Sequence, residues 1–209
     1  MSKYENLPPQ EIEATSFKII RSELGQDLDP KEEAVILRCI HTSADFEYRD
    51  SLYFSDGVID KALSALKSGA NLITDTQMAL AGINKRAAEA LDLKLHCFVA
   101  DPELAARAKD LGVTRSKLAV DKGLTLPEPQ IFVIGNAPTA LLHLADLIAK
   151  GQAAPALVIG VPVGFVNVLE AKAAIMEQDV PQIVNRGRKG GSNIAAAIVN
   201  ALMYQLVER

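Results

Sequence analysis

The stretch that decides the fold class reads Ile131-Phe132-Val133-Ile134-Gly135-Asn136-Ala137-Pro138-Thr139. Its apolar half is short, continuous and rich in β-branched residues, which is typical of a strand buried on both faces of a parallel sheet. A proline after a short polar loop favours the start of a helix, here over 139–149. The stretch therefore predicts a strand, a loop and a helix, the repeating unit of an α/β protein.

The same alternation recurs on both sides of this stretch. Five apolar runs lie at 71–74, 93–100, 131–135, 156–161 and 182–184. Helical patterns follow them at 78–91, 103–124 (broken at Gly112), 139–149, 165–177 and 190–207, and three more precede them at 9–25, 30–43 and 55–69. We therefore predict one domain over 1–209, a three-layer α/β sandwich with a five-stranded parallel sheet and an N-terminal helical extension.

Composition narrows the possible functions. Of the 209 residues, 49% are apolar, which is enough for a buried core and argues against a disordered chain. Lys and Arg number 22 against 26 Asp and Glu, a net charge of −4, and no Trp is present. These values argue against a nucleic-acid partner. Two cysteines cannot form a disulfide framework, and residues 1–5 carry no apolar secretion signal, so we expect a cytoplasmic protein.

One segment raises the question of a membrane span. The 19 residues between Lys150 and Glu170 carry no charge, and that length is enough to cross a bilayer. Glycine and proline interrupt the segment repeatedly, however, so a strand, a loop and the start of a helix fit it better than one apolar helix. We therefore predict no membrane association.

Ligands of open parallel sheets bind at the carboxyl ends of the strands. The loops expected there are 74–78, 135–139, 160–165 and 185–193, and most of them are rich in glycine or proline. Exposed backbone N–H groups and helix N-termini attract anions, and Arg186, Arg188 and Lys189 add positive charge, as does Arg115. The pattern favours a small polyanionic ligand, although glycines that only serve tight turns would give a similar sequence.

Other ligand classes find less support. Neither a Walker P-loop nor a Gly-x-Gly-x-x-Gly fingerprint is present, which disfavours ATP and NAD. The histidines and cysteines lack metal-ligand spacing, so no metal site is predicted. We interpret His96 and His143 as structural because each lies in an apolar segment. His41 stands at the polar end of a helix, where it could cap the helix or act in catalysis, and the helix dipole there favours its charged form.

Taken together with His41, the loops resemble the precorrin-8X methylmutases of vitamin B12 biosynthesis. The matching segments keep the family's order: 16–21, 41–42, 71–78, 114–116, 135–141, 162–166 and 186–192. The resemblance implies a flavodoxin-like sheet and a homodimer with sites near the subunit interface. It also implies an isomerisation that moves a methyl group from C-11 to C-12 of a tetrapyrrole, with no cofactor, any cobalt being carried by the substrate.

The resemblance also implies roles for individual residues. His41 matches the histidine proposed to protonate or hydrogen-bond a ring nitrogen beside the migrating methyl group. The substrate's peripheral carboxylates would meet the residues of the matched loops. These expected substrate contacts are Ser16, Arg21, Thr76, Arg115, Ser116, Asn136, Thr139, Gly164, Arg186, Gly187, Arg188, Gly190, Gly191 and Ser192.

The segment after His41 bears on the choice of substrate. It reads Thr42-Ser43-Ala44-Asp45-Phe46, which is more similar to the anaerobic branch of the family, whose substrate is cobalt-precorrin-8. A non-catalytic corrinoid carrier on the same scaffold remains an alternative. An unrelated sugar-phosphate or nucleotide enzyme is a third interpretation.

Overall fold

The computed structural model describes residues 8–25 and 27–208. In this part of the chain one sheet runs in the order β1-β6-β5-β4-β2-β3. The strands are β1 Leu52–Phe54, β2 Asn71–Thr74, β3 Lys94–His96, β4 Gln130–Ile134, β5 Leu157–Gly160 and β6 Gln182–Asn185. Strands β2 to β6 are parallel and follow the flavodoxin-like order, which confirms the predicted fold class.

The prediction of five strands was one short. Strand β1 pairs antiparallel with the edge of β6, with Leu52 opposite Asn185. Its three residues are too few to show an alternation, and only Leu52 is buried. The pairing is therefore a tertiary event that the local sequence does not signal.

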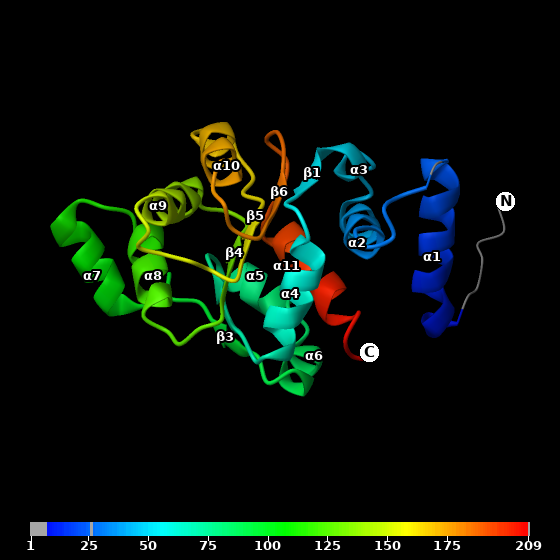
Figure 1. Ribbon diagram of the computed structural model, residues 1–209, viewed down its shortest axis with the longest axis horizontal. Helices are drawn as coiled ribbons and strands as arrows, with labels where there is room; N and C mark the ends of the chain where they lie inside the picture. Colours follow the sequence, from blue (N-terminus) through cyan, green and yellow to red (C-terminus); the bar gives the residue numbers. More distant parts are fainter. Residues whose placement is uncertain (1–7, 26, 209) are drawn as a thin grey trace, which may run out of the picture.

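Helices cover both faces of the sheet. Ile131 and Val133 point into one hydrophobic cluster with α2, α4, α6 and α11, while Phe132 and Ile134 point into a second with α8, α9 and α10. The helices are α1 Pro9–Leu24, α2 Glu33–Ser43, α3 Tyr48–Ser51, α4 Val58–Lys67, α5 Gln77–Gly82, α6 Lys85–Ala90, α7 Pro102–Leu111, α8 Arg115–Leu124, α9 Pro138–Ala149, α10 Val168–Met176 and α11 Ser192–Met203. Helix α1 lies beside α2, at the opposite end of the molecule from α7 (Figure 1).

Two of the predicted helical segments, 103–124 and 78–91, are each divided into two helices in the structure. The break at Gly112 is confirmed, because this residue takes a left-handed conformation (φ +64°) between α7 and α8. The prediction of a single helix over 78–91 is wrong, because this segment forms α5 and α6. The chain turns at Ile83, and Asn84 caps a new helix by accepting a hydrogen bond from the Ala87 N–H at 3.1 Å.

The uncharged stretch after Lys150 contains β5, a loop and the first residues of α10, as expected. Across the described ranges, no helix is both long and apolar enough to cross a membrane. Residues 1–5, on which the expectation about a secretion signal rests, lie outside the described residues.

Candidate active site

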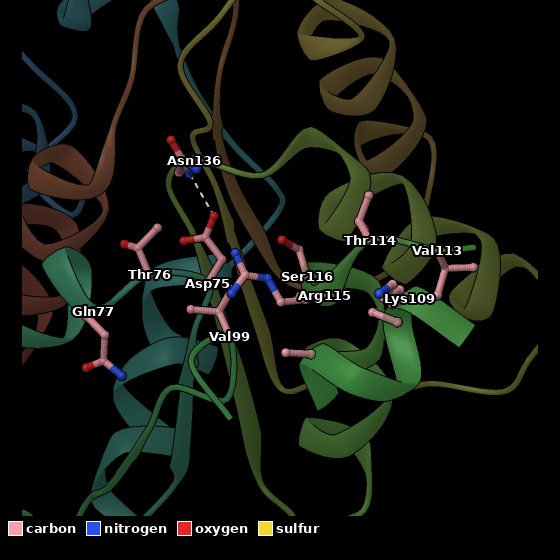
Figure 2. A pocket seen from close by; sticks show the side chains of 12 residues that line it. Asp75, Thr76, Gln77, Val99, Lys109, Val113, Thr114, Arg115, Ser116 and Asn136 are labelled. Atoms are coloured by element: carbon pink, nitrogen blue, oxygen red, sulfur yellow. Dashed lines mark hydrogen bonds between the residues drawn. The ribbon is translucent and has the colours of Figure 1, made fainter. Parts of the chain in front are cut away.

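A cleft opens where the chain order of the sheet reverses, between the carboxyl ends of β2 and β4. Its volume is about 780 Å³, and helices α7 and α8 form the opposite wall. Figure 2 shows polar side chains reaching into it from both walls. These residues include Asp75, Thr76, Gln77, Thr114, Arg115, Ser116 and Asn136. The switch point of an open parallel sheet is where such folds bind ligands.

Asp75 joins the two strand ends at the back of the cleft. Its carboxylate accepts hydrogen bonds from the backbone N–H groups of Gly135, Asn136 and Ala137, at 3.0, 2.7 and 2.7 Å. Burial raises the pKa of the Asp75 carboxyl, while these three donors act in the opposite direction. The backbone donors expected to bind a ligand's anion at this loop are therefore already occupied by the protein's own carboxylate.

The loop after β6 contacts both of these loops. The Thr76 and Ser192 hydroxyls lie 2.7 Å apart, and Thr76 also caps α5 by accepting from the Ala79 N–H. Gly135 packs so closely on Gly191 that a Cβ at Gly135 would come within 2.8 Å of the Gly191 carbonyl oxygen. The structure therefore brings together the loops after β2, β4 and β6.

The loop after β5 is bound to the loop after β6 by backbone hydrogen bonds. Gly191 N–H donates to the Val161 carbonyl at 2.9 Å, and Gly164 N–H donates to the Arg188 carbonyl at 3.2 Å. Gly190 is left-handed (φ +148°), and a Cβ there would overlap the Val161 carbonyl oxygen. The glycines at these positions thus permit close loop packing.

The three cations of the loop after β6 differ in their surroundings. Lys189 forms ion pairs with Asp45, at 2.6 Å, and with Glu47. Arg186 lies over the Tyr53 ring at 5.3 Å and Arg188 over the Phe165 ring at 5.9 Å. In residues 8–25 and 27–208, neither arginine has a carboxylate partner, so both are available to a ligand's carboxylates.

Arg115 is a third arginine with no carboxylate partner in the described part of the chain. It is the first residue of α8, which Thr114 caps by accepting from the Lys117 N–H at 3.3 Å. Its side chain extends from α8 toward the strand ends (Figure 2). The neighbouring Ser116 also lines the cleft, and Thr139 borders it through a 3.2 Å hydrogen bond from Thr114.

An apolar patch adjoins Arg188. It consists of Val163, Phe165, Val166 and Leu169, and the Phe165 side chain is 87% exposed. We call these four residues the 163–169 patch. The carboxyl end of the sheet therefore offers an apolar surface beside guanidinium groups that have no carboxylate partner in the described residues. This arrangement suits an amphipathic ligand with carboxylates on its rim.

His41 does not line the cleft. It lies near the end of α2, exposed to solvent. Its ring centroid is 5.4 Å from that of Phe17 in α1, and the two ring planes are nearly perpendicular (77°). The pKa of His41 is lowered, first by desolvation and then by the nearby Arg38 guanidinium. Both effects disfavour the charged imidazole and so act against the stabilisation expected from the helix end.

Two further predicted contacts lie on α1, away from the cleft. The Ser16 hydroxyl donates to the Ile12 carbonyl at 2.8 Å. Arg21 is held by Glu33 through two hydrogen bonds of 2.7 and 3.2 Å. Within one chain, then, the predicted site residues form two groups, one at the strand ends and one on α1 and α2.

The remaining histidines have structural partners. His96 Nε2 lies 2.8 Å from the Asn71 side-chain oxygen, and His143 Nε2 lies 2.6 Å from an Asp121 oxygen. No cluster of three or more His, Cys, Asp or Glu side chains forms a possible metal site in the described ranges.

Sequence reasoning missed two buried charged groups. Asp75 lies within the predicted loop 74–78, and a carboxylate directly after a buried strand at the switch point is the signal that could have identified it. Lys172 occupies the buried face of α10 with Val168, Ala171 and Ile175. A lysine at a core position of a helical pattern was its signal.

Comparisons with known proteins identify the family of this chain. The family model for precorrin-8X methylmutase matches residues 11–205. A cobalt-precorrin-8 methylmutase of Salmonella typhimurium is 43% identical, over 96% of this chain and 97% of that one. A precorrin-8X methylmutase of Pseudomonas aeruginosa is 37% identical, over 92% and 94%. The crystal structure of a precorrin-8x methyl mutase from Thermus thermophilus superposes with a TM-score of 0.87 at 43% identity, covering 93% of this chain and 94% of that one. This chain belongs to the precorrin-8X methylmutase family.

Proposed function

We propose that this chain is an isomerase of cobalamin biosynthesis that moves a methyl group from C-11 to C-12 of a precorrin-8 macrocycle, giving cobyrinate or its metal-free form, hydrogenobyrinate. The observation that carries the proposal is the set of uncommitted arginines, Arg115, Arg186 and Arg188, on the edge that also holds the 163–169 patch. A tetrapyrrole with acetate and propionate side chains has a matching apolar body and anionic rim. The rearrangement is intramolecular, so we expect no redox cofactor or methyl donor.

We further propose cobalt-precorrin-8 as the preferred substrate, with the cobalt arriving inside the macrocycle. Support comes from the segment after His41 and from the relatives named cobalt-precorrin-8 methylmutase, which reach 43% identity against 37% for the Pseudomonas aeruginosa precorrin-8X enzyme.

In the proposed mechanism, His41 acts on a ring nitrogen next to the migrating methyl group. A lowered pKa leaves the imidazole neutral near pH 7, with an N–H to donate, and makes the imidazolium a stronger acid when it forms. The C-11–methyl bond breaks as the C-12–methyl bond forms, so a proton or hydrogen bond at the nitrogen is needed only to stabilise the altered π system. The arginines would hold the macrocycle in position during the shift.

We also propose that the working protein is a homodimer. Support comes from the separation of the two groups of predicted site residues, since His41, Ser16 and Arg21 lie away from the cleft of their own chain. Ile12 and Ile19 of α1 are about half exposed (51% and 52%), which leaves this helix with an apolar surface for a second copy. Light scattering after gel filtration tests this point, and a monomeric mass at assay concentration would contradict it.

A turnover assay with both macrocycles side by side tests the reaction. We expect substoichiometric protein to convert each to the corrin chromophore, and cobalt-precorrin-8 faster. His41→Ala should lower kcat by roughly 10²–10⁴-fold while still binding product. His143→Ala, which removes a histidine paired with Asp121, serves as the matched control and should keep the wild-type rate.

The other outcomes of this assay point elsewhere. Stoichiometric binding without a spectral change would indicate a corrinoid carrier. Failure to retain any tetrapyrrole, together with tight binding of a phosphate compound, would contradict the proposed substrate class. A wild-type rate in His41→Ala would contradict the role of His41 alone.

A further inference from the structure

Lys172 is a buried cation beneath the loop after β6. Its side chain extends from α10 and is only 1% exposed. In the described part of the chain it has no carboxylate partner. Burying an unpaired ammonium is costly, so its hydrogen bonds have to account for its presence in the core.

Those hydrogen bonds go to two backbone carbonyls of one loop. Lys172 Nζ donates to the Gly187 oxygen at 2.7 Å and to the Lys189 oxygen at 2.8 Å. The Asn185 side-chain amide, also fully buried, donates to the same Lys189 oxygen. The two carbonyls flank Arg188, so the backbone on both sides of that arginine is held from below.

The constraint extends beyond the loop. The Arg188 carbonyl accepts from the Gly164 N–H, and its guanidinium lies over Phe165 in the 163–169 patch. The loop that Lys172 holds therefore places both a free guanidinium and one edge of the apolar patch. A methionine of similar size would fill the same space without the cost of desolvation, so the particular contribution of the lysine is to donate to these carbonyls.

We propose that Lys172 is a positioning residue that holds Arg188 where it receives a peripheral carboxylate of the tetrapyrrole. Lys172 itself has no access to the ligand and acts only through the loop. This inference rests on the proposed function for the identity of the ligand, but the effect on the loop does not.

A double-mutant cycle tests the inference, with the dissociation constant of hydrogenobyrinate as the readout. We expect Lys172→Met and Arg188→Met each to weaken binding about tenfold. If Lys172 acts through Arg188, adding Lys172→Met to Arg188→Met should weaken binding by no more than about twofold. Lys150→Met, which removes an exposed lysine paired with Asp146, is the matched control and should bind as wild type.

Hydrogen exchange in the ligand-free protein gives a second readout. Loosening the loop should speed exchange at the Gly164 and Gly191 amides, which are bonded to Arg188 and Val161, and leave the β4 amides unchanged. Should Lys172→Met fail to fold, Lys172→Gln keeps a donor and should give a smaller loss with the same dependence on Arg188.

Independent effects of the two substitutions on binding would overturn the proposal, as would unchanged exchange at both amides. Absence of turnover by the wild-type protein would contradict the proposed function instead, and the exchange experiment would still decide whether Lys172 holds the loop.

Discussion

At the carboxyl end of the sheet, two loops are each held by a buried side chain, and the two side chains carry opposite charges. At the β2–β4 end, the buried Asp75 carboxylate takes up three backbone N–H groups of one loop. At the β5–β6 end, the buried Lys172 ammonium takes up two backbone carbonyls of another. At both ends the protein's own buried charge satisfies backbone groups, and exposed arginines are left for a ligand.

This comparison changes how glycine-rich loops at strand ends are interpreted. Free N–H groups in such loops form anion sites in many α/β proteins. Here the N–H groups at 135–137 already donate to Asp75, so side chains rather than backbone groups would bind the anionic groups of a ligand. Arginine suits this role because its fork pairs with carboxylates in a fixed geometry.

The largest expected effect is on stability, at the Asp75 end. Asp75→Ala leaves three N–H groups without their acceptor and should lower the free energy of unfolding by about 3 kcal/mol. Urea denaturation measures this loss. Asp146→Ala, which breaks an exposed ion pair with Lys150, is the control and should cost less than about 1 kcal/mol. Equal losses in the two variants would show that Asp75 does not support the loop.

The Lys172 end should show a distinct pH dependence. Burial lowers the pKa of Lys172 from 10.5 to about 8, so between these values the unfolded chain binds more protons than the folded one. The contribution of Lys172 to the free energy of unfolding is therefore lowest below about pH 8 and rises until about pH 10.5. Relative to Lys172→Met, the wild-type protein should gain about 3 kcal/mol across this window.

Denaturation of both proteins at several pH values measures this difference. Tyr48, whose pKa is raised to about 12 by burial, is present in both and cancels. A difference that stays flat with pH would mean that the ammonium is not desolvated as its burial implies.

The exposed arginines should affect binding and leave folding unchanged. Replacing Arg115, Arg186 or Arg188 by Met should each raise KM about tenfold, since each would lose a charge-assisted bond to the substrate. The urea midpoint should stay at the wild-type value because none of the three has a carboxylate partner in the described residues. A normal KM in all three variants would separate this edge from the ligand.

The smallest effect is expected at Lys189. Its ion pairs with Asp45 and Glu47 link the loop after β6 to the segment that follows α2, but its side chain is half exposed. Lys189→Met should therefore lower the unfolding free energy by less than about 1 kcal/mol. A loss comparable to that of Asp75→Ala would mean that this surface contact, rather than Lys172, holds the loop.

Local sequence patterns were enough to predict most of the strands and helices. Continuous apolar runs such as 131–134 indicated strands buried on both faces, and Gly112 marked a break between helices. Strand β1 was not predicted, because three residues at the edge of a sheet are too few to show an alternation of apolar and polar side chains. The break at Asn84 escaped because it depends partly on Asn200, whose side-chain oxygen accepts from the Asn84 N–H at 2.8 Å.

The sequence by itself determined the α/β alternation, the loops at the strand ends and the arginines they carry, because these follow from periodicity and residue type. Only the tertiary structure decided which charges remain available. Asp75 meets donors 60 to 62 positions away, and Lys189 meets Asp45 across 144 positions. Such pairs form when strands and loops assemble, and the spacing of residues along the chain holds no record of them.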